Sequence, residues 1–125
     1  MEELKSVKKA VIPVAGFGTR MLPATKAVPK ELLPILDKPL IQHILEEASS
    51  GAIEEIILIT RSGKEAIENH LDNNFELENL LRKSKKDDIL KKFPKITLKG
   101  LSVLSIRQEK PLGLGHAIFL AKPAL

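Results

Sequence analysis

Three short apolar runs punctuate the chain and predict buried β-strands. They occupy residues 10–15, 55–60 and 101–106, and the third alternates apolar and polar positions more than the other two. Continuous apolar runs of this length are typical of parallel strands that are covered on both faces. We therefore expect these three segments to form the centre of the fold.

Helical periodicity fills the stretches between the expected strands. One helix is predicted between Pro39 and Gly51, which are favourable start and stop residues. A second helix is expected to be capped by Ser62, with Ile67 and Leu71 on its buried side. The inward face of the first helix should comprise Leu40, Ile41, Ile44, Leu45 and Ala48, and the outward face of the second Lys64, Glu65 and Glu68.

The last two helical stretches flank the third strand. Residues 77–93 carry apolar positions at helical spacing, and Pro94 is expected to end that helix. The pattern over residues 113–121 predicts a final helix, which Pro123 should terminate.

This alternation of strands and helices predicts an α/β fold, a Rossmann-like doubly wound parallel sheet. Right-handed crossovers give the three strands the spatial order 3-2-1. In such folds a later strand pairs with the free side of strand 1, and the sequence stops at Leu125 before one is predicted. Because a bare apolar edge promotes aggregation, we expect residues 1–125 to be the N-terminal part of a truncated domain.

Composition limits the class of protein. The 43% of hydrophobic and 29% of charged residues fit an ordinary globular domain, and the absence of Cys excludes a disulfide framework and a Cys-based zinc site. The acidic start Met1-Glu2-Glu3 does not resemble a signal peptide, and no apolar run approaches the ~20 residues of a membrane span. We expect a cytoplasmic protein that does not bind membranes.

The net charge of +4 comes mostly from one lysine-rich stretch. Between Arg82 and Lys99, eight basic residues face two acidic ones. A nucleic-acid site would interleave aromatic side chains for stacking, but aromatics make up 3% of the chain and there is no Trp or Tyr. We interpret the stretch as a solvated helix and turn, with no nucleic-acid partner.

The connection from the first strand to its helix is unusually long. It covers residues 15–38, where two to six residues are normal, so a functional loop is indicated. Glycines let backbone N–H groups approach a phosphate closely, and fixed cations neutralise its charge. The donors that the loop offers to a polyphosphate are Gly16, Gly18, Thr19, Arg20 and Lys30.

Two common phosphate motifs are absent from this loop. It lacks the Gly-Lys-Ser/Thr end of a P-loop, and Met21 stands where a dinucleotide fingerprint requires its third glycine. Taken alone, the two glycines also fit an ordinary tight turn. Arg20 and Lys30, taken alone, also fit exposed surface charge.

The loop as a whole is more specific. Residues 16–34, followed by Asp37-Lys38-Pro39-Leu40, closely resemble the signature loop of nucleoside-diphosphate-sugar pyrophosphorylases. Residues 67–81 and 107–117 are similar to the bacterial branch of that family that uses UTP and glucose 1-phosphate. The resemblance implies that residues 1–125 form the N-terminal nucleotide-binding part of a nucleotidyltransferase domain.

The resemblance also implies roles for residues of the loop. Ala15 and Gly16 would hold the nucleotide through backbone groups, with Gly18 and Thr19 beside them. Arg20 would clamp the departing pyrophosphate, and Lys30 would lie by the phosphates where charge develops; these two are the expected catalytic residues.

The base would be bound after the third strand. By resemblance, Gln108 matches the family's base-reading glutamine. Its amide suits a pyrimidine edge, since it can donate to a uracil carbonyl and accept from its N3–H. Gly113 would contact the same base through its backbone. The alternative for Gln108 is a surface amide at a strand end, and His116 is assigned no role.

The resemblance implies an enzyme that makes UDP-glucose and pyrophosphate with Mg²⁺ and forms homo-oligomers. The aspartate that would hold Mg²⁺ is expected beyond residue 125, so no metal ligand is assigned and the chain alone should be inactive. Alternatives are a glucose-1-phosphate thymidylyltransferase, a non-catalytic regulatory paralogue and a generic nucleotide-binding module. Uracil and thymine differ by one methyl group, worth only about 1–3 kcal/mol in a pocket.

Overall fold

The main sheet has three parallel strands with the most apolar one in the middle. The computed structural model describes residues 6–93 and 101–125. Strand β4 (Glu55–Thr60) pairs with β1 (Lys9–Pro13) on one side and with β5 (Ser102–Arg107) on the other. This confirms the predicted strand order. The first and third strands differ from the expected bounds by one or two residues at their ends.

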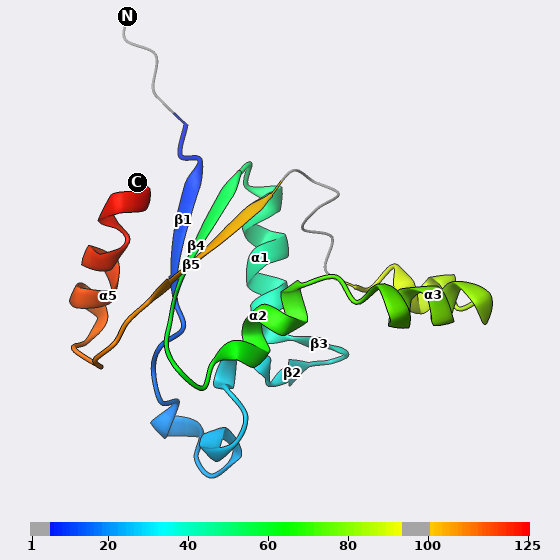
Figure 1. The fold of residues 1–125 in the computed structure, drawn as a ribbon, viewed down its shortest axis with the longest axis horizontal. Helices are drawn as coiled ribbons and strands as arrows, with labels where there is room; N and C mark the ends of the chain where they lie inside the picture. Colours follow the sequence, from blue (N-terminus) through cyan, green and yellow to red (C-terminus); the bar gives the residue numbers. More distant parts are fainter. Residues whose placement is uncertain (1–5, 94–100) are drawn as a thin grey trace, which may run out of the picture.

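Helices cover both faces of this sheet. Figure 1 shows α1 (Leu40–Ser50) and α2 (Glu65–Leu71) on one face and α5 (Leu114–Leu120) on the other. A helix on each face is what a doubly wound arrangement requires. The predicted α/β class is therefore confirmed.

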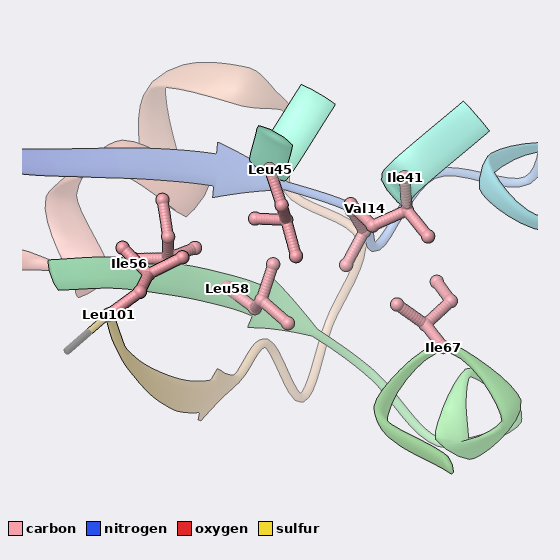
Figure 2. Close-up of a cluster of buried hydrophobic side chains, with 7 residues drawn as sticks. All are labelled: Val14, Ile41, Leu45, Ile56, Leu58, Ile67 and Leu101. Atoms are coloured by element: carbon pink, nitrogen blue, oxygen red, sulfur yellow. The ribbon is translucent and has the colours of Figure 1, made fainter. Parts of the chain in front are cut away.

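Each face of the sheet has its own apolar core, because successive side chains of a strand point to opposite faces. The odd-numbered Ile57 and Ile59 of β4 pack with Ala117 and Ala121 at α5. The even-numbered Ile56 and Leu58 of β4 pack against α1 and α2 on the other face. Figure 2 shows the side chains of this second cluster pointing toward one another. The buried members of this second cluster are Val14, Ile41, Leu45, Ile56, Leu58, Ile67 and Leu101.

The first predicted helix is confirmed, but the start of the second was placed wrongly. Helix α1 ends at Ser50 with Gly51 as its C-cap, as expected. Helix α2 begins at Glu65, and Ser62 does not cap it. The reason is a turn that precedes the helix, in which the Lys64 N–H donates to the Arg61 carbonyl and Gly63 has a φ of 87°.

The stretch after α2 projects away from the sheet. Helices α3 (Phe75–Lys83) and α4 (Asp87–Leu90) extend to the side of the molecule in Figure 1, and the Asn74 side chain caps α3 by accepting from the Leu77 N–H. Amphipathic helix was predicted here. The proposed breaker Pro94 and the basic residues up to Lys99 lie outside the described residues.

The last two elements are helix α5 and a short 3-10 turn. Gly113 is the N-cap of α5, and Lys122–Ala124 form the turn η5, so the last predicted helix is confirmed. Among the described residues, no helix is both long enough and apolar enough to cross a membrane.

Candidate functional site

The three parallel strands end at the same edge of the sheet, so the loops that follow them begin side by side. Beyond the paired strands, the Val14 N–H donates to the Ile59 carbonyl at 2.8 Å, and the Gln108 N–H donates to the Thr60 carbonyl at 2.7 Å. These bonds continue the strand alignment, so Ala15, Arg61 and Gln108 follow side by side. Two of the predicted site residues, Ala15 and Gln108, therefore lie at the same carboxyl edge.

Arg61 joins the first of these loops to the central strand. Its Nε donates to the Ala15 carbonyl at 2.7 Å, and its guanidinium lies 4.1 Å from the centroid of the Phe17 ring. A planar cation on a ring face adds a cation–π attraction to the hydrogen bond. Sequence analysis missed this residue. The available signal was an arginine directly after the central strand.

The long loop is shaped by short turns. It contains three 3-10 turns, η1 (Thr19–Met21), η2 (Ala24–Lys26) and η3 (Lys30–Leu32). A two-stranded hairpin, β2 (Pro34–Ile35) with β3 (Lys38–Pro39), follows and leads into α1. The three turns and the hairpin give the loop a defined conformation.

Gly16 and Gly18 differ in backbone conformation and in the space beside their Cα atoms. Gly18 adopts a left-handed φ of 63°, its carbonyl accepts from Thr25 Oγ1 at 2.7 Å, and an added Cβ would lie 3.0 Å from Thr25 Cγ2. At Gly16, by contrast, an added Cβ would meet nothing within 4 Å. Gly18 is needed for the turn itself, whereas Gly16 leaves open space beside its backbone.

The two predicted catalytic cations are exposed. Arg20 lies in η1 and Lys30 begins η3. Across residues 6–93 and 101–125, neither side chain forms a hydrogen bond or an ion pair. Both charges are accordingly available to a ligand, and whether they meet on one phosphate chain stays a prediction, as do the roles of Gly16, Gly18 and Thr19.

Lys30 is followed by a buried acidic residue with a buried partner. Lys64 Nζ lies 3.2 Å from Glu31 Oε2, and both side chains are almost completely buried. Lys64 was predicted to face outward, and this was wrong because the negative charge of Glu31 draws it inside. The other carboxylate oxygen, Oε1, is buried without a hydrogen bond among the described residues. The pair links η3, and with it Lys30, to the start of α2.

Gln108 is an interior residue at the end of β5. It is 6% exposed, and its Nε2 lies 3.3 Å from the Gly113 carbonyl oxygen and 2.9 Å from Nδ1 of His116. The surface-amide alternative for Gln108 is therefore excluded. Gly113, with a φ of 94°, contacts Gln108 through its carbonyl oxygen, and the role of both residues in binding a base stays a prediction.

A separate cavity lies away from this edge of the sheet. A space of about 450 Å³ opens between the hairpin, α1 and the α3–α4 segment, and no predicted site residue lines it. Lys92 Nζ lies 2.7 Å from Asp37 Oδ2 there, and this hydrogen-bonded pairing lowers the pKa of Asp37 and raises that of Lys92. Burial lowers the pKa of His70, whose Nε2 donates to Gln42 Oε1 at 2.8 Å. Asp37 with Lys92 and His70 with Gln42 are therefore paired within the wall of this cavity.

The described residues do not supply a metal centre. Within residues 6–93 and 101–125, no group of three or more His, Asp or Glu side chains could hold a metal ion. The predicted Mg²⁺ therefore has no ligand set in this part of the structure, and we assign no chemical step to it.

Comparison with known proteins places this sheet and its long first loop in a class of nucleotide-transferring proteins. The family model described as "Nucleotidyl transferase" matches residues 9–125, and the chain belongs to this family. Curated relatives named UTP–glucose-1-phosphate uridylyltransferase are 52% identical to it, over 117 residues for Escherichia coli and 115 for Haemophilus influenzae. The alignments cover 94% and 92% of this chain but 39% of each relative, so the chain spans about two fifths of their length.

Solved structures give the same family. A UDP-glucose pyrophosphorylase from Acinetobacter baumannii is 50% identical, with a TM-score of 0.84, and a UTP-bound form has a TM-score of 0.85. Both matches cover 95% of this chain and 42% of the solved chain. A glucose-1-phosphate thymidylyltransferase from Bacillus anthracis, described as putative, is 23% identical with a TM-score of 0.64, which supports the fold alone.

The two loop glycines provide a matched test of the turn. Gly18→Ala should lower the free energy of unfolding by about 1–2 kcal/mol, because the left-handed backbone disfavours a Cβ and Thr25 crowds it. Gly16→Ala should change it by about 0.5 kcal/mol or less. Urea unfolding of both variants measures the difference, and equal losses would contradict the assigned conformations.

The Glu31–Lys64 pair should be strongly non-additive. Glu31→Leu or Lys64→Met alone should cost about 3–5 kcal/mol of unfolding free energy, because each leaves a buried charge without its partner. The double variant should lose far less than the sum of the two, as coupled residues do. Additive losses in the double-mutant cycle would show that the two charges do not interact.

Proposed function

We propose that this chain forms the nucleotide-binding part of a UTP–glucose-1-phosphate uridylyltransferase, which makes UDP-glucose and pyrophosphate. The observation that carries the proposal is the convergence of the glycine-containing loop and the buried amide of Gln108 at one sheet edge. The curated relatives with that name, and the UTP-bound relative from Acinetobacter baumannii, support the choice of UTP.

The triphosphate would lie along the loop. The open space beside Gly16 admits a phosphate to the backbone N–H groups. Arg61 fixes this segment through the Ala15 carbonyl, so the backbone is held in place before the nucleotide arrives. Arg20 and Lys30, both exposed, supply positive charge within the same loop.

The base would lie at Gln108 and Gly113. Since Gln108 is buried and held by two contacts, its amide presents a defined hydrogen-bonding group to a pyrimidine edge. We propose uridylyl rather than thymidylyl transfer because the relatives that are 52% identical are named uridylyltransferases.

The reaction requires little covalent participation by the protein. A phosphate oxygen of glucose 1-phosphate attacks the α-phosphorus of UTP, a new P–O bond forms, and the α–β bridging bond breaks as pyrophosphate leaves with its electron pair. Catalysis is then mainly positioning and neutralisation of charge. Arg20 would stabilise the departing pyrophosphate, and Lys30 the charge that develops on the phosphates.

Three further properties belong to the proposal through family resemblance. They are a Mg²⁺ requirement, homo-oligomeric assembly and a cytoplasmic location. In the described residues the side chains do not fit a metal site, so the Mg²⁺ requirement rests on the resemblance.

The catalytic role of the loop cations can be tested in the intact protein. Arg20→Ala or Lys30→Ala should lower kcat by about 10²–10³, the usual loss when a preorganised charge donor is removed. Lys83→Ala, which removes an exposed lysine from α3, is the control and should leave kcat unchanged. Release of pyrophosphate from UTP and glucose 1-phosphate is the measurement, and near-normal turnover by Lys30→Ala would refute the role of Lys30.

A further inference from the structure

The contacts of Gln108 determine which end of its amide is available to a ligand. A carbonyl oxygen can only accept a hydrogen bond. The Gln108 atom that faces the Gly113 carbonyl at 3.3 Å must therefore be the amide nitrogen, Nε2. The same carbonyl also accepts from the Ala117 N–H at 3.1 Å, which ties its position to the first turn of α5.

His116 accepts a hydrogen bond from the second N–H of this amide group. Its Nδ1 lies 2.9 Å from Gln108 Nε2, which already directs one hydrogen to Gly113. Nδ1 must accept the remaining hydrogen, and this requires a neutral imidazole with its proton on Nε2. Both amide hydrogens are thus used inside the protein.

The remaining polar atom of the side chain is Oε1. Among the described residues, none donates to it, and it is not one of the fully buried atoms left without a partner. Gln108 consequently offers a bound base an acceptor and no donor. This refines the sequence-based expectation, in which the amide both donates to uracil and accepts from it.

We propose that His116 is a positioning residue that makes the site select bases with an N–H at position 3. This inference rests on the proposed function and adds a basis for its nucleotide specificity. Uracil and thymine carry a hydrogen on N3, which Oε1 can accept, whereas cytosine has a lone pair there that Oε1 repels. An amide released by loss of His116 could turn and offer its NH₂ group to cytosine.

Three substitutions of His116 separate hydrogen bonding from packing. His116→Asn keeps an oxygen acceptor at the position of Nδ1, His116→Gln moves the acceptor one bond further away, and His116→Ala removes it. The Ala and Gln variants should lower the ratio of UTP to CTP affinity by about 5- to 10-fold, the worth of one hydrogen bond. The Asn variant should keep the ratio of the unaltered protein.

The experiment is calorimetric titration of the intact protein and its variants with UTP, dTTP and CTP. The ratio of UTP to dTTP affinity should stay constant throughout, because both bases carry the same N3–H. A merely structural role would weaken all three nucleotides equally, and that result would overturn the inference. So would loss of selectivity in His116→Asn. The comparison of Asn with Gln decides the question even if the Ala variant does not fold.

The unaltered protein distinguishes this inference from the proposed function. Binding of UTP and CTP with equal affinity would overturn the role of His116 while leaving a nucleotide-binding function intact. Absence of UTP binding would contradict the proposed function itself, and the inference with it.

Discussion

The hydrogen bond from Arg61 to the Ala15 carbonyl is the contact on which the candidate site depends. Arg61 follows the central strand β4, and Ala15 opens the loop that follows β1, so a 2.7 Å bond joins the two strand ends. Stacking of the same guanidinium on Phe17 extends this hold to the residue between the two loop glycines. Arg61 therefore holds the residues on both sides of Gly16 to the end of the central strand.

A second anchor acts at the far end of the loop. The buried pair of Glu31 and Lys64 holds η3 against the start of α2, one residue away from Lys30. A buried ion pair contributes little net stability compared with an apolar pair, so its value here is better explained by placement than by stability. The loop is thus held to the sheet near its beginning and to a helix near its end, and its exposed cations lie between or beside these anchors.

The sequence was sufficient for the architecture but insufficient for the contacts that fix the site. Apolar runs and helical periodicity report burial, which is why β1, β4, β5 and α1 were predicted with nearly correct bounds. Periodicity does not report charge pairing. It placed Lys64 outside because lysine is seldom buried, and only the tertiary approach of Glu31 reverses that preference. Arg61 was missed because its partner, the Ala15 carbonyl, is 46 residues away in the sequence. His116 was assigned no role because periodicity does not report its contact with the Gln108 amide.

The central claim is that UTP lies along the 15–38 loop with its base at Gln108. A crystal structure of the intact protein with UTP tests this most directly. The account predicts phosphates against the backbone of Gly16–Thr19, with Arg20 and Lys30 turned toward them, and the uracil N3–H directed at Gln108 Oε1. A nucleotide bound elsewhere, such as the cavity of about 450 Å³ beside α3, or a base that leaves Gln108 untouched, would contradict it.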